Sequence, residues 1–130
     1  MTQEDKDLLL KDLCARLPYG VKIYSNGIPH EQTLKGFIPD VEHYNIKPYL
    51  RPMSSMTEEE SAELSNIISE WFDKELFYLT EEPFLEYALS RINYSISPKL
   101  FDWLNKNMFD YRGLIQKGLA LEASEGMYNK

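Results

Sequence analysis

Apolar residues recur at helical spacing along most of this 130-residue chain. From Leu64 to Phe72 they return every three or four positions, which predicts an amphipathic helix. Thr57 and Glu60 have the spacing of a capping box, which sets the start of this helix. The same pattern predicts further helices over residues 2–16, from residue 80 or 82 to 92, over residues 97–108, and in a short stretch after Asp110.

The first predicted helix is delimited on both sides. Thr2 and Asp5 form a second capping box, and Pro18 with Gly20 ends the helix. Cys14 falls on the predicted inward stripe, so we expect a small buried hydrophobe rather than a reactive thiol. The stripe consists of Leu9, Leu10, Leu13, Cys14 and Leu17.

The segment 97–128 holds two adjacent helix signatures. Ser97 suits the N-cap and Pro98 the first helical position. Asp110 is placed to cap a second, short helix, which Gly118 ends in the left-handed conformation. The predicted inward residues are Leu100, Phe101, Trp103, Leu104 and Met108 in the first helix, and Leu114 and Ile115 in the second.

Three segments have the composition of short strands, at residues 21–25, 33–38 and 42–46. Residues 47–56 carry two prolines and are predicted to be an extended connector. Residues 75–80 fit either a frayed helix end or a short buried strand. Together these patterns predict a single α+β domain over residues 1–130. In it, four to five helices cover a small three-stranded antiparallel sheet.

Composition is that of a folded protein, with 43% hydrophobic and 27% charged residues, nine tyrosines and six phenylalanines. A single cysteine allows no intramolecular disulfide and fits a reducing compartment. The apolar runs are too short to span a bilayer, and the polar start is unlike a signal peptide. We therefore expect a cytoplasmic protein.

The net charge of −7 is unevenly distributed. Acidic and basic residues balance over positions 1–56, so all of the excess lies in positions 57–130. An acidic surface disfavours nonspecific binding to nucleic acid or to an anionic membrane. It is compatible with a basic protein partner, although the simplest interpretation is that it keeps the protein soluble.

Two acidic clusters were considered for chemistry. Asp40, Glu42 and His43, together with His30, match no metal-ligand spacing, so no metal site is expected. The run at residues 58–60 with Glu63 is predicted to be a helix start and a solvated face. No nucleophile motif or phosphate-binding glycine loop is present. We expect no enzyme, no catalytic residue and no cofactor.

Tyr111 and Arg112 are predicted to lie on an exposed turn beside Gly113, where another backbone could approach closely. The favoured interpretation is internal: Arg112 pairs with Asp110 or a nearby glutamate, and Tyr111 packs on the preceding helix. The alternative is an interface for a protein partner. The candidate partner-binding residues are Tyr49, Arg51, Tyr111, Arg112, Met127 and Tyr128.

Three blocks of sequence, LLLKDLCARLPYGV (8–21), KPYLRPMSSMTEEE (47–60) and FDYRGLIQKGLALEASEGMY (109–128), resemble a family of uncharacterised small proteins. That family is encoded by Bacteroides-type gut bacteria and their phages and prophages. The resemblance implies no activity, cofactor or catalytic residue. It does imply a cytoplasmic setting and a link to phage or mobile DNA.

The chain departs from this family at one place. Where relatives carry a histidine pair before the FDYRGL segment, it has Asn107 and Met108. If those histidines are catalytic in the family, this chain has lost that chemistry. If they only close a bend between helices, Asn107 and Met108 can replace them. The helical pattern favours the second interpretation.

Three functional hypotheses follow. The first is a non-enzymatic interaction or accessory protein of a phage or mobile element. The second is an acidic inhibitor that occupies the basic site of a nucleic-acid-binding protein. The third, and least favoured, is an enzyme of unrecognised type.

Overall fold

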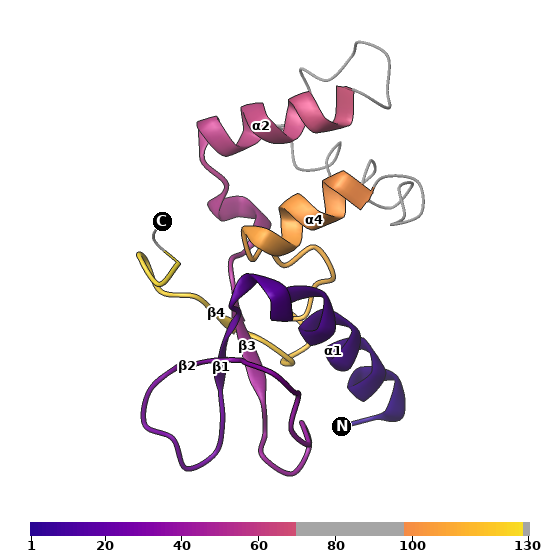
Figure 1. The fold of residues 1–130 in the computed structure, drawn as a ribbon, viewed down its shortest axis with the longest axis vertical. Coiled ribbons are helices and arrows are strands. Elements are labelled where there is room, and N and C mark those ends of the chain that lie inside the picture. The colour runs from indigo at the N-terminus through magenta and orange to yellow at the C-terminus, as the bar shows by residue number, and fades with distance from the viewer. Residues whose placement is uncertain (70–97, 129–130) are drawn as a thin grey trace. The chain divides into compact units, whose positions relative to one another are not determined.

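The computed structural model describes residues 1–69 and 98–128 (Figure 1). The predicted helix ending at residue 92 and the ambiguous segment 75–80 lie outside the described residues. The described chain divides into two compact units, Met1–Pro52 with Asn105–Lys130, and Met53–Leu104. The single domain stays a prediction.

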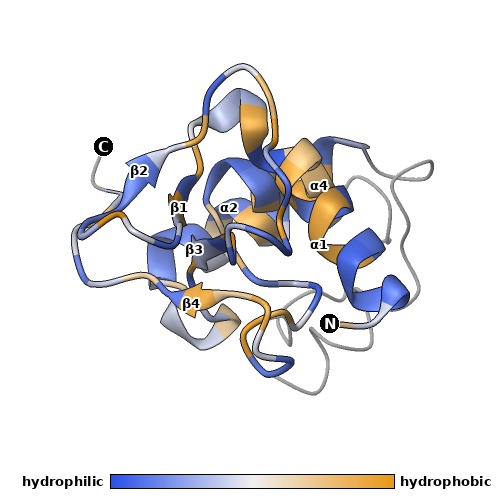
Figure 2. Cartoon of the chain, turned by 90° about the horizontal axis from the view of Figure 1, so that it is seen from below, coloured by the Kyte–Doolittle hydropathy of each residue, from blue (hydrophilic) through white to orange (hydrophobic). Residues whose placement is uncertain are grey.

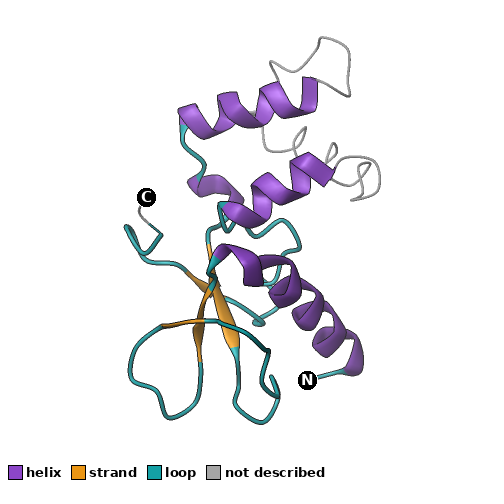
Figure 3. Ribbon diagram, in the orientation of Figure 1, coloured by secondary structure: helices purple, strands orange, loops and turns teal. Residues whose placement is uncertain are grey.

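The described elements confirm the α+β class. Figure 3 shows helices and short strands joined by long loops. In chain order they are α1 (Gln3–Arg16), the 3₁₀ turn η1 (Leu17–Tyr19), β1 (Lys22–Tyr24), β2 (Gln32–Thr33), β3 (Lys47–Leu50), the 3₁₀ turn η2 (Met53–Ser55), α2 (Glu58–Ser69), α4 (Pro98–Lys106) and β4 (Leu121–Glu122).

The sheet differs from the predicted one. Its strand order is β2-β1-β3-β4, and β1 is antiparallel to both β2 and β3. The fourth strand pairs parallel with β3, with Tyr49 opposite Leu121 and Leu50 opposite Glu122. The prediction of a three-stranded antiparallel sheet was therefore wrong in detail. A fourth strand, more than 70 residues beyond β3 in sequence, completes the sheet.

The predicted connector at 47–56 was wrong, because its first residues form the inner strand β3. Pro48 lies opposite Ile23 of β1. Pairing with β4 begins at the next residue, Tyr49, so neither ladder needs the N–H that Pro48 lacks. The extended backbone that proline favours is thus used as a strand.

The other two predicted strands were also displaced. Residues 41–45 form a turn instead of a strand, and Asn45 adopts a positive φ of 50°. The segment 33–38 is a strand only at its start, since Gly36 has a φ of 77°. There the Phe37 N–H donates to the Lys35 carbonyl at 2.9 Å, which turns the chain away from the sheet.

Helix α1 begins at the predicted cap, with the Asp5 N–H donating to Thr2 Oγ1 at 3.0 Å. Its buried face was predicted incorrectly. Cys14 is exposed, and the buried residues of the helix are Leu9, Asp12, Leu13 and Arg16. These four residues recur at steps of three, one and three positions, so they share one face of the helix. Two of them are charged. A search for apolar residues at helical spacing therefore does not identify this face as the buried one. Figure 2 shows hydrophilic and hydrophobic residues alternating along α1.

The core of the first unit joins α1 to the sheet. Leu9 and Leu13 pack with Val21 and Ile23 of the β1 region in one buried cluster. The cluster is completed by Leu34, Val41, Ile46 and Met108. A second cluster consists of Leu50, Leu114, Leu119 and Ala120.

In the second unit the capping box of α2 is confirmed. The Glu60 N–H donates to Thr57 Oγ1 at 3.2 Å, and the Thr57 N–H donates to Glu60 Oε1 at 3.0 Å. Helix α4 begins at Pro98, as predicted. The Trp103 Nε1–H donates to Glu63 Oε2 at 3.0 Å, which ties α4 to α2. Within the described part of the chain, no helix is long and apolar enough to cross a bilayer.

The exposure of Cys14 is directly testable. We expect one thiol per chain to react with a thiol-specific chromogenic reagent in the absence of denaturant, because the side chain faces solvent. The Cys14→Ser variant is the control and should release no chromophore. A thiol that reacts only after urea is added would contradict the orientation of α1.

Candidate interaction surface

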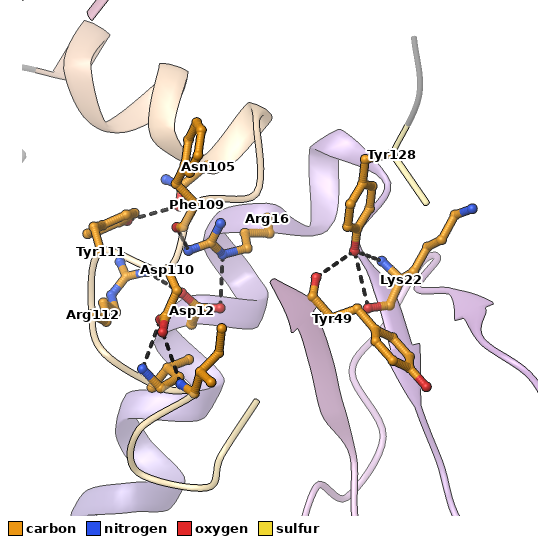
Figure 4. Close-up of polar contacts among 12 residues, drawn as sticks. Asp12, Arg16, Lys22, Tyr49, Asn105, Phe109, Asp110, Tyr111, Arg112 and Tyr128 are labelled. Carbon is orange, nitrogen blue, oxygen red and sulfur yellow. Dashed lines mark hydrogen bonds and ion pairs between the residues drawn. The ribbon is translucent and has the colours of Figure 1, made fainter. Parts of the chain in front are cut away.

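Arg112 takes part in a buried ion-pair network with α1 (Figure 4). Its Nη1 lies 2.6 Å from Asp12 Oδ1, and Arg16 Nε lies 2.9 Å from Asp12 Oδ2. The side chains of Asp12 and Arg16 are fully buried, and that of Arg112 is 14% exposed. The internal interpretation of Arg112 is therefore supported, but its partner is Asp12 rather than Asp110 or a glutamate.

The second arginine ties the same helix to the segment that follows α4. Arg16 Nη2 donates to the Phe109 carbonyl at 2.6 Å. Its Nη1 is buried and has no hydrogen-bond partner among the described residues. One carboxylate thus bonds to two guanidinium groups inside the first unit, at sequence separations of 4 and 100 residues.

Tyr111 lies beside both guanidinium groups. Its ring centroid is 4.6 Å from Arg112 Cζ and 5.4 Å from Arg16 Cζ, which are cation–π distances. Its hydroxyl donates to Asn105 Oδ1 at 2.9 Å, so the side chain contacts the end of α4. Burial raises the pKa of Tyr111.

The predicted helix after Asp110 is absent, since residues 111–118 form turns. Asp110 nevertheless caps this segment, accepting the Leu114 N–H at 2.8 Å and the Ile115 N–H at 3.0 Å. Gly118 has the predicted left-handed φ, 75°. Gly113 also has a positive φ, 73°, and a Cβ there would meet nothing within 4 Å. The glycine is explained by this backbone conformation, and no other backbone of the described chain approaches it closely.

The position where the resembling family has histidines is a bend. Met108 is 1% exposed, has a φ of 62°, and donates its N–H to the Asn105 carbonyl at 3.1 Å. Asn107 is also buried, at 5% exposure. These contacts support the interpretation that Asn107 and Met108 close the bend.

Arg51 is held by the same bend. Its N–H donates to the Met108 carbonyl at 2.7 Å, and its carbonyl accepts the Asp110 N–H at 2.8 Å. The guanidinium Cζ lies 4.2 Å from the centroid of the Phe109 ring. Arg51 therefore links the end of β3 to the segment that carries Tyr111.

Tyr128 bridges two strands through its hydroxyl (Figure 4). Lys22 stands opposite Tyr49, one step from the Ile23–Pro48 pair. The Tyr128 hydroxyl accepts the Lys22 N–H at 2.9 Å and donates to the Tyr49 carbonyl at 2.7 Å. It occupies the place of a direct ladder bond. Burial raises the pKa of Tyr128 to about 12.

Met127 is half-buried and donates its N–H to the Ser124 carbonyl at 3.1 Å, in the turn before Tyr128. Of the six candidate partner-binding residues, the structure brings Arg51, Tyr111 and Arg112 together around Phe109 and Asp110. It brings Tyr49 and Tyr128 together at the sheet.

Among the residues that the structure describes, the most exposed aromatic side chains were not singled out by sequence. Phe37 is 74% exposed, Tyr44 44% and Tyr19 38%. The available signal for Phe37 was Gly36, a turn-forming residue directly before an aromatic one. Because this loop is not helical, helical periodicity does not predict which of its side chains are buried.

The residues considered for a metal site form a local turn. Asp40 Oδ1 accepts the N–H groups of Glu42 and His43, both at 3.1 Å. The hydrogen bond from the His43 N–H lowers the pKa of Asp40. Across residues 1–69 and 98–128, no group of three or more histidine, cysteine or acidic side chains is arranged to hold a metal ion.

Comparisons with protein-family models, with curated proteins and with solved structures find no match to this chain.

The buried network predicts a strong and non-additive effect on stability. The Asp12→Leu variant should lower the free energy of unfolding by about 3–5 kcal/mol, because Arg16 then stays buried without a counter-charge. The double variant Asp12→Leu with Arg16→Met removes the two fully buried charges and leaves only Arg112, 14% exposed, without its partner. Its loss should therefore be smaller than the sum of the two single losses. Urea denaturation of both single variants and of the double variant measures the coupling. A double variant whose loss equals the sum of the single losses would contradict a charge network.

The Tyr128 bridge predicts a pH-dependent contribution to stability. Removing the hydroxyl in Tyr128→Phe should cost about 1–3 kcal/mol at pH 8, since the Lys22 N–H and the Tyr49 carbonyl lose their partner. The folded-state pKa, about 12, is higher than the unfolded value near 10. The contribution is therefore full below pH 10 and is lost as the pH rises towards 12.

Urea midpoints measured from pH 8 to 12 test this. The difference between the wild type and Tyr128→Phe should shrink above pH 10. The exposed Tyr44→Phe is the matched control and should follow the wild type throughout. A difference that stays constant to pH 12 would exclude a protonated Tyr128 bridge.

Proposed function

We propose that this protein is a non-enzymatic interaction protein that binds another protein in the cytoplasm. Its resemblance to phage and prophage proteins suggests an accessory role for a phage or mobile element. The observation that supports this best is the presentation of Phe37, which is 74% exposed beside a well-anchored core.

Phe37 stands on a short, defined turn. Leu34 before it is 5% exposed and donates its N–H to the Val21 carbonyl at 2.9 Å. Ile38 after it packs against the same core cluster. Between these anchors, the positive φ of Gly36 and the Phe37 N–H bond to Lys35 define a γ-turn. A turn that holds a large apolar side chain in solvent between two anchored residues is typical of a binding loop.

The energetics favour an anchor role for such a residue. An aromatic side chain buries about 150–250 Å² when it is covered, and aromatic anchors dominate many interfaces. A turn fixed on both sides also loses little conformational entropy on binding. The polar groups of Tyr111, Arg112 and Tyr128, in contrast, already bond within the chain.

The acidic inhibitor is retained as a second candidate because of α2. Glu58, Glu59 and Glu63 are exposed on this helix and add negative charge to its first two turns. A partner with a basic site would be attracted to such a surface, and salt would weaken the complex.

A tagged chain expressed in its native host tests the proposal. We expect affinity purification to recover the same protein reproducibly at 0.1 M and at about 0.5 M salt, because an apolar contact is not screened. A partner lost at the higher salt would instead favour the acidic inhibitor. The untagged chain is the control, and failure to recover any reproducible partner under several lysis conditions would contradict both.

A further inference from the structure

We draw no further inference here: the strongest candidate, the surface around the exposed Phe37 side chain on the loop that follows β2, carries none beyond the proposed function, because nothing in the described part of the structure shows what covers it.

Discussion

The carboxylate of Asp12 is the group on which the first unit depends. It is fully buried and accepts from two arginines, one on its own helix and one a hundred residues later. Removing a carboxylate from water is costly, so the burial is tolerated only because both oxygens are bonded to guanidinium groups. The same arginines hold the Phe109 carbonyl and the Tyr111 ring. The segment that follows α4 is thereby fixed against α1.

The end of the chain is held in a comparable way at the sheet. Tyr128 supplies a hydroxyl where β1 and β3 would otherwise bond directly, and its ring packs against the core cluster. β4 adds a parallel strand to β3 just before this point. The polar groups of Tyr111, Arg112 and Tyr128, which the sequence suggested for binding a partner, thus form hydrogen bonds within the chain. Among the described aromatic side chains, Phe37 is the most exposed, at 74%.

Sequence predicted the starts of the described helices well, but not most of the strands. Thr57 with Glu60 and Thr2 with Asp5 cap helices as expected, because each cap depends on residues three positions apart. The α+β class and the start of α4 were also predictable. Cys14 was placed on the wrong face because the buried face of α1 contains Asp12 and Arg16, and hydrophobicity cannot identify buried charges. The candidate site was only partly predictable: Tyr111 and Arg112 were recognised as unusual, but not the role of Asp12.

By itself, then, the sequence determined where α1, α2 and α4 begin and that strands and helices are combined. The tertiary structure decided which strand completes the sheet, which carboxylate binds Arg112, and that Phe37 rather than Tyr111 is left exposed. The physical reason is the distance along the sequence over which each interaction acts. Caps and turns act between neighbours along the chain, whereas β4 reaches β3, and Arg112 reaches Asp12, across most of its length. Such partners are chosen by packing and desolvation in three dimensions, which no local pattern contains.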